Sequence, residues 1–116
     1  MTPRRSPMPE LGLLDFHVLL ALGDGPAHGY AIGKELEART GGRLNPTTGT
    51  LYQALKRLVA SGLIEPREVD PAESGDSRRK VFALTRLGKR AAAEEAKRLE
   101  ALVQVARDKK LYGAST

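Results

Sequence analysis

The side chains best suited to recognition chemistry are concentrated in residues 45–64, which read NPTTGTLYQALKRLVASGLI. The polar positions of this segment carry hydroxyl, amide and cationic groups: Thr47, Thr48, Thr50, Gln53, Lys56 and Arg57. Hydroxyl and amide groups can hydrogen-bond to the edges of DNA bases, and lysine and arginine form charge-assisted contacts with phosphates or guanine. The segment therefore predicts a surface that reads a nucleic acid.

A second concentration of charge lies towards the end of the chain. Residues 78–98 contain eight basic side chains and two acidic ones, whereas residues 68–77 contain four acids and no base. The net charge of +5 attracts polyanions in general. Such a run can also be no more than a solvated face, so its meaning depends on the elements that carry it.

Catalytic and metal chemistry are not expected from this sequence. It contains no cysteine, which excludes disulfides and thiolate zinc sites, and His17 and His28 lack a neighbouring cluster of ligands. We therefore expect no metal and no cofactor. There is no Gly-x-Ser-x-Gly elbow and no pair of carboxylates set apart from basic neighbours, so an enzyme is not expected either.

Length and hydropathy indicate a single cytoplasmic domain. The 116 residues suffice for one domain with a small core, which a second copy of the chain would help to stabilise. No apolar run approaches the ~20 residues that span a bilayer, and residues 1–10, MTPRRSPMPE, lack the apolar core of a signal peptide. These ten residues are expected to be a disordered basic arm.

The first ordered element is expected to be a helix over residues 11–22. Its apolar residues fall on two sides: one stripe contains Leu11, Leu14, Val18 and Leu22, and the other contains Leu13, Phe16 and Leu20. A helix that is apolar on two sides needs two partners, of which one can be its own domain. A second subunit is the expected partner of the other stripe.

Two more helices follow the first. After the break GDGPAHGY, a short helix places Ile32 and Leu36 on one face and ends at Gly41–Gly42. The polar segment then forms a third helix, for which we predict Asn45 as the N-cap and Pro46 as the first residue. This helix buries an apolar stripe and leaves its polar side chains facing outward; the stripe consists of Leu51, Leu55, Leu58 and Val59.

The period of the pattern changes after Gly62. Residues 63–69 and 80–84 are short β-branched or aromatic segments joined by a polar loop, and they predict a hairpin. Pro66 cannot donate to a ladder, so its strand should lie at an edge. Thr85 is the expected N-cap of a final helix over residues 86–109, which is ~36 Å long at ~1.5 Å per residue. This helix is longer than its own domain requires, so its apolar stripe should pack against another molecule.

The order of these elements predicts a fold that is mainly α with a small β-hairpin. We expect a winged helix-turn-helix over residues 11–84, a dimerisation helix over residues 85–111 and a flexible tail over residues 112–116. In this fold the second helix of the pair lies across the major groove of DNA, and the hairpin contacts the adjacent backbone or minor groove. The polar third helix is then the recognition helix.

Three linked motifs make the sequence resemble a known family. They read HGYAIGKEL, PTTGTLYQALKRLVASGLI and SRRKVFALTRLGKR, in this order over residues 28–90, and they are similar to the PadR family of bacterial transcriptional regulators. The resemblance implies a homodimeric repressor, and such a dimer should read an inverted-repeat operator in double-stranded DNA. The residues expected to bind DNA are Thr47, Thr48, Gly49, Thr50, Tyr52, Gln53, Lys56, Arg57, Ser77, Arg78, Arg79 and Lys80.

The resemblance also implies dimerisation through the first and last helices. The residues expected at this interface are Leu13, Phe16, Leu20, Ala92, Ala96, Leu99, Leu102, Val103 and Ala106. With one C-terminal helix the chain is similar to the short subfamily, some members of which hold flat hydrophobic ligands between tryptophans. This chain has no tryptophan, and a small hydrophobic effector would use the apolar face around Phe16, against the final helix.

Two alternatives stay open for these residues. Tyr52 can pack its ring against the second helix or contact a phosphate through its hydroxyl. The outer face of the recognition helix could also bind a protein, as in a winged-helix interaction module without sequence-specific DNA binding. That module would need an apolar patch on the outer face, which carries polar side chains instead.

Overall fold

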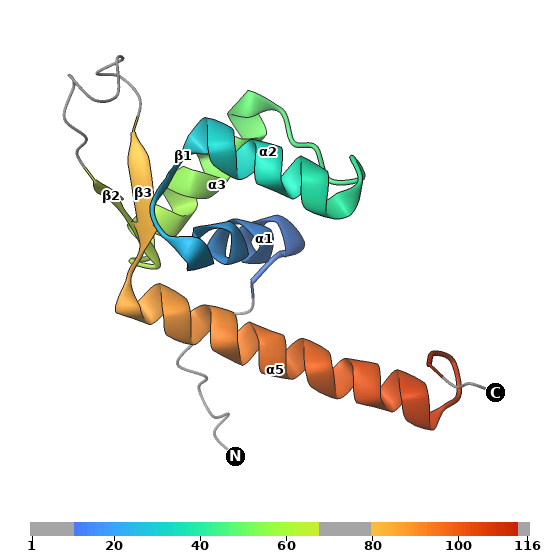
Figure 1. Ribbon diagram of the computed structural model, residues 1–116. Helices are drawn as coiled ribbons and strands as arrows, with labels where there is room; N and C mark the ends of the chain where they lie inside the picture. Colours follow the sequence, from blue (N-terminus) through green and yellow to red (C-terminus); the bar gives the residue numbers. More distant parts are fainter. Residues whose placement is uncertain (1–10, 68–79, 114–116) are drawn as a thin grey trace.

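The computed structural model describes residues 11–67 and 80–113, which form a mainly helical structure with a small antiparallel sheet at one side (Figure 1). The helices are α1 (Leu13–Ala21), the 3-10 helix η1 (Leu22–Asp24), α2 (Gly29–Thr40), α3 (Thr48–Ala60) and α5 (Arg86–Asp108). The strands are β1 (Ala27–His28), β2 (Ile64–Arg67) and β3 (Val81–Leu84). This order is a winged helix-turn-helix followed by a long helix, and it confirms the predicted fold class. The predicted N-terminal arm and most of the wing loop lie outside the described residues, and the predicted tail is described only as far as Gly113.

The hydrophobic core lies where α1 packs against α2, α3 and α5. Its largest fully buried side chains are Val18, Leu19, Ile32, Leu36, Leu55, Leu58 and Ile64. Of the first predicted stripe, Val18 and Leu22 are buried and Leu11 and Leu14 pack against the same core. Leu19, which belonged to neither predicted stripe, is fully buried as well. The second stripe of α1 is more open, since Leu13 is 65% exposed and Leu20 is 40% exposed in the single chain.

The start of α3 differs from the prediction. The N-cap is Thr47, whose Oγ1 accepts a hydrogen bond from the backbone N–H of Thr50 at 3.1 Å, so Asn45 and Pro46 precede the helix. The preceding turn is fixed by Thr40, whose Oγ1 accepts from the N–H of Leu44 at 2.9 Å. Thr47 itself has an extended backbone, with φ −65° and ψ 163°, immediately before the helix begins.

The described strands form a sheet in the order β1-β3-β2. β2 and β3 make the predicted hairpin, with Pro66 opposite Phe82, and the position of β2 at the edge confirms the expectation from Pro66. Each strand begins one residue later than predicted, and the predicted end of the first strand lies outside the described residues. The third strand, β1, was not predicted; its two residues pair with Phe82 and Val81 on the other side of β3.

α5 extends well beyond the rest of the described structure (Figure 1). Its 23 residues correspond to ~34 Å at ~1.5 Å per residue. Thr85 caps it as predicted, accepting from the N–H of Gly88 at 3.0 Å. A Cβ at Gly88 would overlap the carbonyl oxygen of Leu63, so a glycine here lets α5 approach the backbone before β2 closely. Only the first turns of α5 are packed, at Ala91 and Glu95. No described helix is both long and apolar enough to cross a membrane.

Candidate DNA-binding face

Helix α3 separates its buried and exposed side chains cleanly. Leu51, Ala54, Leu55 and Leu58 are buried against the core and fix the helix in position and rotation. The residues predicted to bind DNA from this helix are all exposed: Thr47, Thr48, Gly49, Thr50, Tyr52, Gln53, Lys56 and Arg57. The structure thus brings eight predicted residues onto one rigid element, whose exposed face is polar.

Two of the three threonines have a local structural role. Thr47 caps the helix, and its hydroxyl also lies 3.0 Å from the hydroxyl of Thr50. This pair holds the first turn of α3 closed, which orients the free backbone N–H groups of that turn towards solvent. An anionic group such as a phosphate is favoured at this position by the helix dipole.

The remaining polar side chains of α3 are available to a ligand. Within residues 11–67 and 80–113, Thr48, Gln53 and Lys56 form no side-chain hydrogen bond or ion pair. Gly49, Gln53 and Lys56 stand four and three residues apart and therefore share one face. A base edge and a neighbouring phosphate could be contacted from this face at the same time.

Gly49 has no packing role in the single chain. A Cβ built at this position would have no atom within 4 Å, in contrast to Gly88. Glycine in a helix is less favourable than alanine by about 0.5–1 kcal/mol, so its presence here is unexplained by the fold. A close approach of another backbone, such as that of DNA, would explain it.

Arg57 is placed differently from its neighbours. Its Nη2 donates to Oδ1 of Asp15 at 2.8 Å and so joins α3 to the start of α1. Asp15 has a side chain that is only 16% exposed, and Arg57 is its ion-pair partner. The guanidinium predicted to contact DNA is thus occupied within the chain.

Tyr52 packs against the start of α2. A Cβ at Gly29 would lie 2.5 Å from the hydroxyl oxygen of Tyr52, so the tyrosine tip rests over this glycine. Of the two alternatives for Tyr52, the packing role is therefore observed. The ring is still 43% exposed, which leaves its outer edge on the surface of the face.

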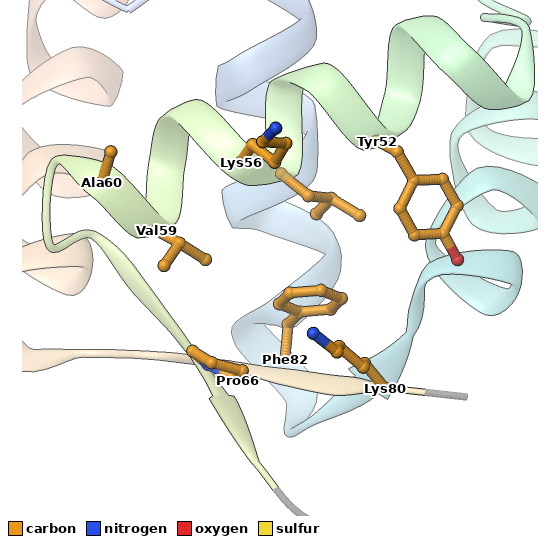
Figure 2. Close-up of a pocket in the computed structure, with 8 residues that line it drawn as sticks. Tyr52, Lys56, Val59, Ala60, Pro66, Lys80 and Phe82 are labelled. Atoms are coloured by element: carbon orange, nitrogen blue, oxygen red, sulfur yellow. The ribbon is translucent and has the colours of Figure 1, made fainter. Parts of the chain in front are cut away.

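The wing contributes Lys80 to the same region. Ser77, Arg78 and Arg79 lie outside the described residues, whereas Lys80 is exposed just before β3. Figure 2 shows Lys80 and Tyr52 at one end of a groove between α3 and the sheet. The groove has a volume of about 480 Å³, and Lys56 also lines it, so a helix cation and a wing cation border one space.

A further cation near the wing was not predicted. Arg67 on β2 stands opposite Val81 and has a half-exposed side chain, 3.6 Å from Glu65. Its signal in the sequence was weak, because a lone arginine in a short strand is normally a solvated side chain. Its position in the hairpin, next to the strand that follows Lys80, makes it a candidate for a phosphate contact.

The residues predicted at the dimer interface are exposed or half-buried on the single chain. Leu13, Leu20, Ala96, Leu102 and Val103 are exposed, and Phe16, Ala92, Leu99 and Ala106 are half-buried. Val105 near the end of α5 is also exposed, as are Leu111 and Tyr112 after the helix, and none of these three was predicted. Exposed apolar side chains such as these are typical of a contact with another protein chain.

Two titratable side chains stabilise the packing around α1. Nη1 of Arg39 lies 3.0 Å from Nδ1 of His17, and burial together with the charge of Arg39 lowers the pKa of His17 below 6.5. Glu95 is 6% exposed and accepts hydrogen bonds from Arg98 and from the N–H of Leu11. The hydrogen bond from Arg98 is the main cause of a lowered pKa of Glu95, which burial alone would raise. The described residues contain no group of three or more His, Cys, Asp or Glu side chains that could hold a metal ion.

Comparison with known proteins identifies the family. The profile of the family described as "Transcriptional regulator PadR-like family" matches residues 18–94. The transcriptional regulator Rv3488 of Mycobacterium tuberculosis is 40% identical over 90 residues, which cover 76% of this chain and 77% of that protein. An uncharacterized 37.1 kDa protein in transposon TN4556 of Streptomyces fradiae is 47% identical over 79 residues. Here the match covers 68% of this chain but only 21% of the Streptomyces protein.

Solved structures of regulators share the fold. A PadR family transcription regulator from Clostridium difficile R20291 has a TM-score of 0.72 and 28% identity, with 84% of this chain and 97% of that chain covered. Bacillus subtilis PadR, solved in complex with operator DNA, has a TM-score of 0.62 at 24% identity over 72% of this chain and 47% of that chain, which shows a common fold. The family and the mycobacterial relative are transcriptional regulators and not enzymes, as predicted. The winged helix-turn-helix, its polar α3 and these matches together show that the chain belongs to the PadR-like family of transcriptional regulators.

Proposed function

We propose that this protein is a homodimeric repressor that binds an inverted-repeat operator in double-stranded DNA in the bacterial cytoplasm. The observation that carries this proposal is the exposed face of α3. Within the described residues, Thr48 and Gln53 form no side-chain hydrogen bond there and a Cβ at Gly49 would meet nothing. In support, Bacillus subtilis PadR has been solved with operator DNA. Family membership supports regulation through DNA binding; the role as a repressor is the proposal.

In this proposal α3 provides base discrimination, and the wing provides affinity through phosphate contacts. Gln53 is held by the buried leucines of α3, so its amide is positioned well enough to discriminate bases, and Lys56 contacts a phosphate beside it. Ser77, Arg78, Arg79 and Lys80 of the wing contribute affinity through phosphates. Arg57 is removed from the base-reading group, because its ion pair with Asp15 gives it a bracing role.

The proposed dimerisation is supported by the apolar side chains that the single chain leaves exposed on α1 and α5. We assign residues 11–84 to DNA binding and residues 85–111 to the dimer, with α1 contributing Leu13 and Leu20 to the same interface. Symmetry of the dimer places two copies of α3 on one face of the duplex, about one helical turn or ~34–36 Å apart. A small hydrophobic effector that occupies the apolar surface around Phe16 and α5 would change this separation.

The alternative, a winged-helix module for protein contact, has less support. It needs an apolar patch on the outer face of α3, and the exposed residues there are threonine, glycine, glutamine and lysine. The exposed apolar surface lies on α1 and α5 instead, where the dimer is proposed.

Salt titrations of DNA binding test the proposal. The protein should bind DNA from its own promoter region more tightly than a scrambled duplex at the same stated salt concentration. Replacing Gln53 by Ala should cost ~1–3 kcal/mol on the promoter site with little change on scrambled DNA. Replacing Arg79 by Ala should weaken both and reduce the salt slope by about one unit. Equal affinity of the wild type for promoter and scrambled DNA would contradict specific binding.

A further inference from the structure

His17 lies within the apolar stripe of α1 that the proposed dimer buries. It follows Leu13 by four residues and precedes Leu20 by three, so the three side chains share one face of the helix. Leu13 and Leu20 are exposed, whereas His17 is already half-buried by its own chain. A partner that packs on this stripe would therefore cover an imidazole together with the two leucines.

The contact with α2 requires this imidazole to be neutral. Nη1 of Arg39 lies 3.0 Å from Nδ1 of His17 and donates to the backbone carbonyl of the same residue at 3.3 Å. A guanidinium has N–H donors only, so Nδ1 must be the accepting, unprotonated nitrogen, and the hydrogen is on Nε2. Protonation of Nδ1 would break this bond and place an imidazolium directly against a guanidinium.

The surface hollow beside His17 is basic. Of the described residues that line it, His17, Arg39 and Arg43 are basic and none is acidic. The others are Leu13, Thr40 and Leu44. A second positive charge on His17 would thus be added where cations already lie close together, which disfavours the protonated form.

Three carboxylates on the elements that pack around α1 are held by other cations. The pairs are Glu35 with Arg39 on α2, Asp15 with Arg57 between α1 and α3, and Glu95 with Arg98 on α5. Glu35 therefore offsets the charge of Arg39, and Arg43 is a further cation beside His17.

We propose that this face of α1 makes assembly sensitive to pH, because a second copy of the chain packs there only while His17 is neutral. Apolar side chains of the partner would remove water from the imidazole and disfavour its charged form. The dimer would then bind fewer protons than two separate chains, so association weakens as pH falls. The inference rests on the proposed homodimer and adds a way to regulate it.

The pH window lies below the ordinary pKa of histidine. In the single chain, burial and then the charge of Arg39 lower the pKa of His17 from 6.5, and the partner would lower it further. The dissociation constant of the dimer should rise by up to ~tenfold per pH unit for each His17 that takes up a proton. Occupancy of an inverted-repeat operator should fall with it, because linked half-sites bind more tightly than one.

Sedimentation analysis of the full chain from pH 8 to pH 5 at constant ionic strength tests the inference. The dissociation constant of the wild-type dimer should be nearly constant above pH 6.5 and rise below it. His17→Gln keeps an oxygen acceptor for Arg39 but does not titrate, so it should dimerise at pH 8 and lose this rise. His17→Lys carries a permanent charge and should be mainly monomeric already at pH 8. His28→Gln, at the other histidine of the chain, is the matched control and should keep the wild-type profile.

Circular dichroism on the same samples shows whether each protein is folded, and the range ends above the ordinary pKa of 4.5 for Glu95. The inference is wrong if a folded wild-type dimer keeps a constant dissociation constant down to pH 5. It is equally wrong if folded His17→Gln keeps the rise, or if folded His17→Lys dimerises like the wild type at pH 8. Stronger association in acid would also overturn it, since the partner would then place a carboxylate beside His17. A wild type that is monomeric at pH 8 would instead overturn the proposed dimer, and this inference with it.

Discussion

At the scale of single residues, the glycines fall into two kinds: those where the fold leaves no room for a side chain and one where it does. Gly88 and Gly29 each lie where a Cβ would meet another part of the chain, namely the Leu63 carbonyl and the Tyr52 hydroxyl. A Cβ added at Gly49 would have no neighbouring atom within 4 Å. All three of these glycines lie in helices, and only the packing around each one reveals which of them the fold requires.

Replacing Gly49 by Ala should therefore raise stability and lower DNA affinity at once. The added methyl group reduces the entropy of the unfolded chain and should increase the free energy of unfolding by about 0.5–1 kcal/mol. The same methyl group would stand between α3 and the DNA backbone. Urea denaturation and fluorescence anisotropy with the promoter duplex measure the two effects.

Gly88→Ala is the control, for which the effect on stability has the opposite sign. Its Cβ would overlap the Leu63 carbonyl oxygen, so the substitution should lower the free energy of unfolding. A Gly49→Ala variant with unchanged DNA affinity would show that the backbone of DNA stays away from this position.

The two neighbouring cations of α3 should behave differently. Lys56→Ala should reduce DNA affinity and the salt slope by about one unit, with stability unchanged. Arg57→Ala should instead lower the free energy of unfolding by about 0.2–1 kcal/mol, because it breaks the ion pair with Asp15. A double-mutant cycle with Asp15→Ala isolates that pair energy. A zero coupling energy together with a loss of DNA affinity in Arg57→Ala would return Arg57 to the DNA-binding group.

At the scale of elements, strong periodic patterns predicted the structure well and short or competing signals did not. The helices around Leu19, Leu36 and Leu55 were predicted because burial repeats over several turns. β1 was missed because two residues cannot show a period of two. The start of α3 was misplaced because asparagine and threonine both favour the N-cap position, and the structure uses Thr47, whose hydroxyl accepts from the N–H of Thr50.

The candidate DNA-binding face was also predicted only where it depends on a repeating pattern within one element. Exposure of the polar residues on α3 followed from the buried leucine stripe, which fixes the rotation of the helix. The pairing of Arg57 with Asp15 could not be predicted, since the two residues are 42 positions apart and their meeting depends on how α1 crosses α3. The groove with Lys56 and Lys80 was also out of reach, because it depends on the distance between a helix and a hairpin.

The packing of α1 against α2 and α5 should make stability depend on pH in two windows. The folded-state pKa of His17 is lowered, so the unfolded chain binds the proton more strongly and stability falls as pH drops through 6.5. The pKa of Glu95 is lowered as well, so its contribution is present above pH 4.5 and is lost as pH falls through the lower folded value. Thermal unfolding from pH 8 to pH 3 measures both slopes.

Single substitutions assign these slopes. His17→Gln should flatten the curve just below pH 6.5, and Glu95→Gln should flatten it below pH 4.5. Each variant leaves the other window as in the wild type. An unchanged slope in either variant would show that other groups titrate there.

At the scale of the whole molecule, the single chain exposes more apolar side chains than its fold accounts for. The surface of α5 beyond residue 98 contributes no buried residue, although Leu102, Val103 and Val105 all lie there. Most of the stability of a helix in a protein comes from packing of its apolar face, and the described residues supply no buried contact for this part of α5. A second subunit provides that contact in the proposed dimer.

Leu102→Asp should convert the protein to a folded monomer. Leu102 is 54% exposed in the single chain, so the substitution does not disturb the core, but in a dimer it would bury an unpaired charge. Light scattering at micromolar concentration gives the mass, and circular dichroism reports the fold. Ala101→Asp, at the adjacent exposed position, is the control and should stay dimeric. A wild type that is itself monomeric at this concentration would rule out the dimer.

The close contact at Gly88 joins the start of α5 to the backbone that leads into β2. The first turn of α5 lies directly against the backbone at Leu63, and the hydroxyl of Thr85 donates to the carbonyl of Gly62 at 2.6 Å, so two contacts hold the start of the helix against the segment before β2. We therefore expect a tilt of α5 to move β2 and β3 with it. In the proposed dimer, a ligand that changed the angle between the two α5 helices would therefore also move the two hairpins. The spacing between half-sites that the dimer can bind would change with them.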